Sequence, residues 1–175
     1  MTRPMTLTQL QTWTVSQYHQ MLQAGILSVD DPVELLEGQI IEMSPQQPPH
    51  AATTHRASSY LASLLADQAA VRVQLPITLL PNSEPEPDIA IVHPNPRDYV
   101  DCHPTPVNIF WLIEVADTTL AKDRTQKAPV YAKAGIPEYW ILEVTRQQVY
   151  VFRQPGSNNY HSRNYFSPRG DGGRN

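Results

Sequence analysis

The chain has little cysteine and no long apolar run, and both absences narrow the classes of protein to which it can belong. Cys102 is the only cysteine among 175 residues, which excludes an intrachain disulfide and a multi-cysteine zinc site. No apolar segment approaches the roughly 20 residues that a membrane-spanning helix needs. The first residues also lack the apolar core of a signal peptide. We therefore expect a cytoplasmic protein without a membrane partner.

Positive charge and nucleotide-binding motifs are also scarce. The net charge is −4, which excludes a polycation that coats nucleic acid nonspecifically and leaves only a local basic patch for such contacts. Glycine-rich phosphate loops and the G-x-S-x-G nucleophile motif do not occur. His50 and His55 are five positions apart, so they would not share a helical face, and we expect no zinc site there.

Proline is abundant and divides the chain into segments. A length of 175 residues fits one domain with one core. The 17 prolines concentrate in three stretches, 45–49, 81–87 and 94–106, which we interpret as loops. We expect a single domain over 1–166 and a disordered polar tail over 167–175.

The N-terminal part of the chain predicts two helices and a hairpin. Thr14 and Gln17 form a capping box at the start of the first helix, and Gly25 is its expected end. Residues 33–43 predict a hairpin with its turn at 37–38. A second helix is expected over about 50–67, where apolar residues recur at helical spacing. This apolar stripe consists of Ala57, Tyr60, Leu61, Leu64 and Leu65.

Strand signals follow the second helix. Apolar residues alternate with period two over 71–79, although Pro76 indicates a sheet edge or a bulge. Residues 89–92 and 109–115 are nearly continuous apolar runs. Such runs are typical of strands that are covered on both faces.

The remaining segments predict one more helix and a second hairpin. A helix is expected over 120–134, where Pro129 either kinks it or starts another helix. Residues 138–144 and 148–152 predict a hairpin. The fold class is therefore α/β (α+β), with a mixed sheet flanked by helices and an N-terminal helix and hairpin.

Two carboxylates and a lysine are the strongest candidates for chemistry. Asp88 opens one apolar strand, Glu114 closes the next, and Lys127 follows on the expected helix. Burying a carboxylate in a strand costs folding free energy unless the carboxylate meets a cation or a hydrogen-bond donor. Two carboxylates with one ammonium group suggest a divalent metal site and a charge that positions water.

Simpler interpretations of the same residues stay open. Asp88 could be an ordinary strand-start residue, and Glu114 could belong to a structural salt bridge. Lys127 stands four positions after Asp123, so the two could form a surface ion pair on a helix.

Several segments carry a resemblance to a known family. The most specific are Glu-Val-Ala-Asp at 114–117 and Gly-Ile-Pro-Glu-Tyr-Trp at 135–140. The other matching positions are 33–45, His50, 86–90, 118–120, Asp123, Lys127, Tyr131, 134 and 141. Over roughly 14–153 the chain resembles the Uma2 family (DUF820) of the PD-(D/E)xK nuclease superfamily.

The resemblance implies a restriction endonuclease-like core and Mg²⁺-dependent hydrolysis of phosphodiester bonds in DNA, with Mn²⁺ as a substitute. Asp88 and Glu114 match the two motif carboxylates and, with the backbone carbonyl of Val115, would hold the metal. The superfamily's usual lysine position is Ala116 here, and Lys127 matches a lysine displaced to the following helix.

Three further matches are candidates for accessory roles: Glu34, His50 and Asp123. Cutting both strands of a duplex usually needs two active sites, so we also predict a homodimer. The rival hypothesis is a nuclease-fold protein that binds nucleic acid or another protein without turnover. Ala116 and the acidic net charge favour this rival.

Overall fold

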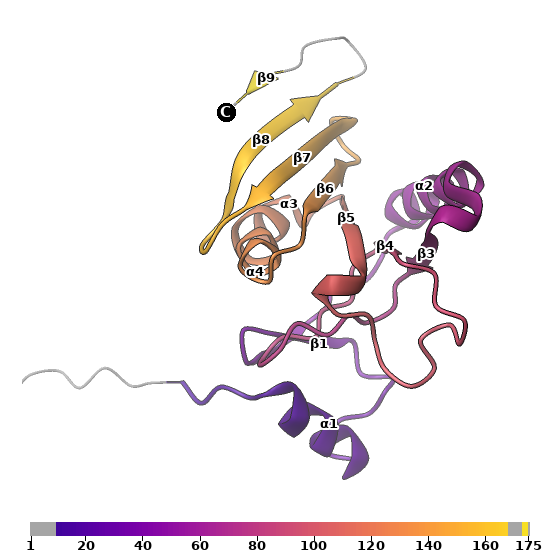
Figure 1. Cartoon of the computed structure of the whole chain (residues 1–175). Helices are drawn as coiled ribbons and strands as arrows, with labels where there is room; N and C mark the ends of the chain where they lie inside the picture. Colours follow the sequence, from indigo (N-terminus) through magenta and orange to yellow (C-terminus); the bar gives the residue numbers. More distant parts are fainter. Residues whose placement is uncertain (1–9, 168–172, 175) are drawn as a thin grey trace, which may run out of the picture.

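The structure, a computed structural model, describes residues 10–167 and 173–174. Its element order confirms the predicted fold class, a mixed sheet flanked by helices with an N-terminal helix and hairpin (Figure 1). The helices are α1 (Val15–Gln23), α2 (Pro48–Leu65), α3 (Leu120–Lys122) and α4 (Ala128–Lys133). The hairpin is β1 (Val33–Leu36) and β2 (Gln39–Glu42). The main sheet contains β3 (Ala70–Val73), β4 (Ile89–Val92), β5 (Ile109–Ala116), β6 (Glu138–Glu143), β7 (Gln148–Pro155), β8 (Tyr160–Phe166) and β9 (Gly173–Arg174).

The strand order of the main sheet brings the two candidate carboxylates together. The strands run β3-β4-β5-β6-β7-β8-β9, and every pair is antiparallel except β5–β6. Ile89 of β4 pairs with Ile113 of β5. One step further along this register, Asp88 lies beside Glu114. The parallel β5–β6 pair is joined by the crossover that contains α3 and α4, as a parallel connection requires.

Both faces of the sheet are covered at β4 and β5. Ile89 and Ile91 of β4 pack in one core cluster with residues of α2. Their neighbours Ala90 and Val92 pack in the other cluster with residues of α4. Successive strand residues point to opposite faces, so this arrangement explains the continuous apolar runs predicted for β4 and β5.

The apolar stripe predicted for α2 was wrong in part. Tyr60 and Leu64 are 67% and 60% exposed, whereas Thr54, Ser58 and Leu61 are buried. The buried face of α2 thus carries two small polar side chains beside Leu61. The two large residues that completed the predicted stripe therefore lie on the exposed side.

The strand predicted over 71–79 ends earlier, at Val73. Gln74 has a positive φ of 51°, which interrupts the extended ladder, and Pro76 has no N–H for a strand pair. Ile77 and Leu79 remain buried, but their N–H groups bond within the following loop, to Pro85 and Ser83. Val73 and Leu75 are exposed, at 38% and 44%, so the predicted alternation of burial holds only for Ile77 and Leu79.

The helix predicted over 120–134 is present, but its hydrogen-bonding pattern changes from α to π and back to α along the segment. A π-helical turn, Asp123–Lys127, connects α3 and α4, and the Ala128 N–H donates to the Asp123 carbonyl. Pro129 lies in the first turn of α4 and cannot donate a bond to the carbonyl four residues earlier. The predicted irregularity is therefore present as a π-helical turn just before the proline.

The C-terminal elements extend beyond those predicted. β7 continues to Pro155, and β8 was not foreseen because its sequence is mostly polar. Most of the tail predicted over 167–175 lies outside the described residues, while Gly173–Arg174 forms β9 against β8. Within the described part of the chain, no helix has the length and apolar character of a membrane span.

Candidate active site

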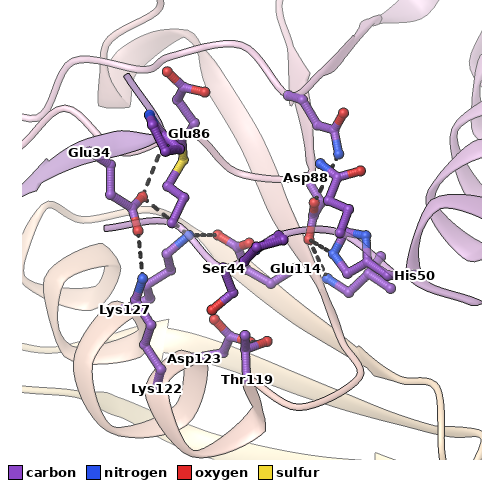
Figure 2. Close-up of a pocket in the computed structure, with 16 residues that line it drawn as sticks. Glu34, Ser44, His50, Glu86, Asp88, Glu114, Thr119, Lys122, Asp123 and Lys127 are labelled. Atoms are coloured by element: carbon purple, nitrogen blue, oxygen red, sulfur yellow. Dashed lines mark hydrogen bonds and ion pairs between the residues drawn. The ribbon is translucent and has the colours of Figure 1, made fainter. Parts of the chain in front are cut away.

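A cavity of about 380 Å³ lies where the hairpin, the C-terminal end of β5 and the start of α2 meet (Figure 2). All the candidate site residues from the sequence line this cavity. They are Glu34 of β1, His50 of α2, Asp88 before β4, Glu114 and Val115 of β5, and Asp123 and Lys127 of the π-helical turn. Figure 2 shows Glu114 between two groups, with Glu34 on one side and Asp88 with His50 on the other.

Asp88 is held by three hydrogen bonds. The Val115 N–H donates to Oδ2 over 2.8 Å, and His50 Nε2 lies 3.1 Å from the same oxygen. The side-chain amide of Gln74 donates to Oδ1 over 3.3 Å. Burial acts to raise the pKa of Asp88, but the bonds from His50, Val115 and Gln74 outweigh it and hold the pKa below its ordinary value. Asp88 is therefore a fixed, ionised carboxylate.

Glu114 is almost fully enclosed, with 4% of its surface exposed. Lys127 Nζ donates to Oε1 over 2.9 Å, and the Tyr131 hydroxyl donates to the same oxygen over 2.8 Å. Burial raises the pKa of Glu114 to about 8, although Lys127 acts in the opposite direction. No hydrogen bond is made to Oε2 within the described residues, and Glu114 lines the cavity. One oxygen of Glu114 is thus available to a ligand.

Lys127 connects Glu114 to the N-terminal hairpin. Its Nζ lies 3.3 Å from Oε2 of Glu34, whose residue surface is only 1% exposed. Lys122 Nζ lies 3.1 Å from the other oxygen of Glu34. Burial alone would lower the pKa of Lys127, but the Glu114 and Glu34 carboxylates outweigh it and raise that pKa. Lys127 is therefore a charged ammonium inside the protein.

Asp123 and Lys127 do not form the surface pair that was considered from their spacing. Both residues are buried, and the ion pairs of Lys127 are with Glu34 and Glu114. The Thr119 hydroxyl donates to Asp123 over 2.7 Å. Burial is the main cause that raises the pKa of Asp123.

The cavity carries an excess of negative charge. Its lining contains five carboxylates and two ammonium groups, an excess of three negative charges when all are ionised. The carboxylates are Glu34, Glu86, Asp88, Glu114 and Asp123, and the ammonium groups are Lys122 and Lys127. A divalent cation bound here would relieve the repulsion among the carboxylates.

Sequence reasoning missed the contacts of Gln74 and Tyr131. Tyr131 was only a matching position of the resemblance. It stands four positions after Lys127, about one helical turn, and this spacing could have indicated that both side chains reach Glu114. Gln74 carried no sequence signal, because only the packing of β3 beside β4 brings it to Asp88. Glu86 belongs to a visible acidic stretch with Glu84 and Asp88.

The donor set fits a hard cation such as Mg²⁺. Asp88 and Glu114 offer carboxylate oxygens, and Mg²⁺ is commonly bound by one or two carboxylates with several retained waters. Within residues 10–167 and 173–174, no three His, Cys, Asp or Glu side chains form a ready-made metal group. A metal here would therefore depend on water and backbone oxygen for its other ligands. The role of the Val115 carbonyl stays a prediction.

Comparisons with known proteins agree with this fold. The chain is similar to the crystal structure of "a putative nuclease belonging to DUF820 from Anabaena variabilis ATCC 29413", with a TM-score of 0.68 and 20% identity over 88% of this chain and 84% of that chain. At this identity the likeness shows the fold alone. No curated protein matches the chain. Residues 15–171 match the Uma2 family, described as "Putative restriction endonuclease". Because this match spans most of the sequence, the chain belongs to the Uma2 family.

Proposed function

We propose that this protein is a metal-dependent endonuclease that hydrolyses phosphodiester bonds in DNA, with Mg²⁺ as its ion and Mn²⁺ as a substitute. The observation that carries this proposal is the convergence of Asp88, Glu114 and Lys127 on one cavity. The three residues come from separate elements, yet Lys127 Nζ lies 2.9 Å from Glu114 Oε1. Asp88 accepts a hydrogen bond from the backbone N–H of Val115, the residue after Glu114.

In this proposal Asp88 and Glu114, with the Val115 carbonyl, hold the ion. Mg²⁺ bound there would supply Lewis acidity toward the phosphoryl oxygen and would lower the pKa of an attacking water. His50 keeps Asp88 oriented, since its Nε2 donates to the carboxylate. Tyr131 does the same for Glu114 through its hydroxyl.

Lys127 takes the role of the lysine that the superfamily places two residues after the second carboxylate. Ala116 at that position is fully buried and has no charge to offer. The Lys127 ammonium reaches Glu114 from the π-helical turn instead of from β5. From there it would orient the attacking water and offset negative charge in the transition state.

The acidic cavity imposes an order on binding. Without a cation, the excess of carboxylates repels a phosphate group. With the ion held by Asp88 and Glu114, the repulsion falls and a phosphodiester can approach. We therefore expect no metal-independent cleavage.

The test is cleavage of plasmid and single-stranded DNA with Mg²⁺, with Mn²⁺ and with EDTA. Asp88→Asn and Glu114→Gln should each lower turnover by about 10²-fold or more, comparable to the loss of one electrostatic stabiliser. Glu143→Gln is the matched control, because Glu143 is a buried glutamate that pairs with the end of β5 but lies outside the cavity. Cleavage that persists in EDTA, or equally in all three variants, would refute the proposal.

A second candidate is a protein that retains this fold but binds nucleic acid or another protein without hydrolysis. Ala116 in place of the usual lysine is the observation that favours it. This candidate predicts that DNA is retained in a gel-shift assay while no metal supports cleavage. Cleavage that is lost in Asp88→Asn would eliminate it.

A further inference from the structure

Gln74 has an unusual backbone conformation at the edge of the cavity. It follows β3 directly and has a φ of 51°. This left-handed region is unfavourable for a residue with a side chain, because Cβ approaches the following carbonyl oxygen. Such conformations persist only where the surroundings enforce them, and they concentrate at functional sites.

In this conformation Gln74 donates two hydrogen bonds to a single residue. Its backbone N–H donates to the Asp88 carbonyl over 3.1 Å, and its side-chain amide donates to Asp88 Oδ1 over 3.3 Å. The backbone bond continues the β3–β4 pairing by one step beyond Val73. The side-chain bond is a separate contact that regular sheet pairing does not require.

The side-chain bond completes the restraint of the Asp88 carboxylate. His50 and the Val115 N–H both bond to Oδ2. The Gln74 bond is therefore the contact that fixes Oδ1 and, with it, the rotation of the carboxylate plane. A carboxylate that is restrained at both oxygens presents its remaining lone pairs in one direction only.

The other strained positions are not at this site. Six further non-glycine residues in the described chain have positive φ, and none of them lines the cavity. They are Glu37, Ala66, Asp98, Tyr99, Gln147 and Gln154. Glu37 and Gln147 lie in hairpin turns, where positive φ is ordinary. Gln74 differs because its conformation serves a contact with a candidate metal ligand.

We propose that Gln74 is a positioning residue that orients the Asp88 carboxylate for a divalent cation, an inference that rests on the proposed function. Some side chains hydrogen-bond to a metal ligand without touching the metal. Their removal typically changes metal affinity or activity by about 10–100-fold. Gln74 itself does not need to touch the ion. Its effect passes through the orientation of Asp88.

The experiment measures Mn²⁺ affinity by calorimetry, together with the melting temperature, for two variants of Gln74. Gln74→Met keeps the length and the strained backbone but removes the amide donor. Gln74→Gly removes the donor and also relieves the strain, because glycine adopts positive φ freely. Both should weaken Mn²⁺ binding by about 10-fold or more, while Gln74→Gly should melt at a temperature no lower than that of Gln74→Met.

Two further variants complete the design. Gln147→Gly is the matched backbone control, since Gln147 has a φ of 52° in an exposed turn, and it should leave Mn²⁺ affinity unchanged. Asp88→Asn should abolish most binding. Wild-type affinity in both Gln74 variants, with loss in Asp88→Asn, would overturn the role of Gln74 alone. No Mn²⁺ binding by the wild type, or full binding by Asp88→Asn, would overturn the proposed function and this inference together.

Discussion

Lys127 carries its charge where little water reaches it, so its ionised form depends on its two carboxylate partners. Its side chain is 7% exposed, and those of Glu114 and Glu34 are 5% and 1% exposed. A buried ion pair adds little stability compared with apolar packing, but removal of one partner leaves an uncompensated charge. The network therefore specifies the site geometry more than it stabilises the fold.

Lys127→Met should reduce the free energy of unfolding by about 3–5 kcal/mol, because Glu114 would remain buried without a cation and Glu34 would keep only Lys122. Lys133→Met is the control. Lys133 also pairs with a glutamate, Glu37, but these side chains are 65% and 55% exposed, so a loss of about 0–1 kcal/mol is expected. Urea denaturation measures both values. Equal losses in the two variants would mean that Lys127 is solvated in solution.

At the residue scale, the sequence identified the ionisable groups of the site, His50 included, but not the bonds that Gln74 and Tyr131 make to them. Asp88 and Glu114 were visible because a carboxylate next to an apolar run needs an explanation. The bond from Gln74 was not visible, because it depends on a positive φ and on the pairing of β3 with β4. The burial of Lys127 was equally hidden, since the π-helical turn that directs it inward has no clear sequence signature.

At the element scale, α1 supports the hairpin that delivers Glu34 to the site. Val15 and Tyr18 of α1 pack with Leu35, the residue next to Glu34. The helix begins at a capping box, in which the Gln17 N–H donates to the Thr14 hydroxyl over 3.2 Å. Local sequence was sufficient to predict this element, because the cap is formed by residues three positions apart.

Thr14→Ala should lower the free energy of unfolding by about 1 kcal/mol, because it leaves a helix N–H without its acceptor. Ser16→Ala is the control, as Ser16 is an exposed residue inside the same helix. Alanine favours helix more than serine does, so this control should be neutral or slightly stabilising. Thermal or urea unfolding, monitored by circular dichroism, measures the change in unfolding free energy for both variants. A loss in Ser16→Ala as large as that in Thr14→Ala would contradict the capping role.

Elements whose limits depend on distant contacts were predicted less well. The period-two pattern over 71–79 correctly indicated the burial of Ile77 and Leu79, but a loop rather than a ladder satisfies their backbone groups. In α2, periodicity indicated a helix but assigned Tyr60 to the wrong face. Which face of an amphipathic helix is buried depends on how closely the sheet approaches, and this is a tertiary property.

At the scale of the whole molecule, the cavity lies at a junction of separately formed parts. The hairpin contributes Glu34, the sheet contributes Asp88 and Glu114, and the crossover contributes Lys127. The mixed sheet was predictable because buried strands and amphipathic helices alternate along the chain. The sequence suggested that Asp88, Glu114 and Lys127 share one site, whereas the part played by Glu34 was predicted only through the resemblance.

We predict that the protein is a homodimer in solution. Cleavage of both strands of a duplex usually needs two active sites, and twofold dimers are the commonest assembly. β3 has a sheet partner on one side only within the described residues, so it offers an unpaired edge. Light scattering coupled to size-exclusion chromatography should give twice the chain mass. A single-chain mass over the whole concentration range would contradict the prediction.

Metal binding should be visible in the stability of the whole domain. A ligand that binds only the folded state stabilises it by about 2.7 kcal/mol at a concentration 100 times its dissociation constant. For a chain of this size, each kcal/mol corresponds to about 2–4 °C. Saturating Mg²⁺ or Mn²⁺ should therefore raise the melting temperature by about 5–11 °C, because the ion relieves repulsion among the cavity carboxylates. Asp88→Asn should lose most of this shift, whereas Glu143→Gln, a buried glutamate outside the cavity, should retain it. An equal shift in both variants in differential scanning fluorimetry would show that the metal binds elsewhere.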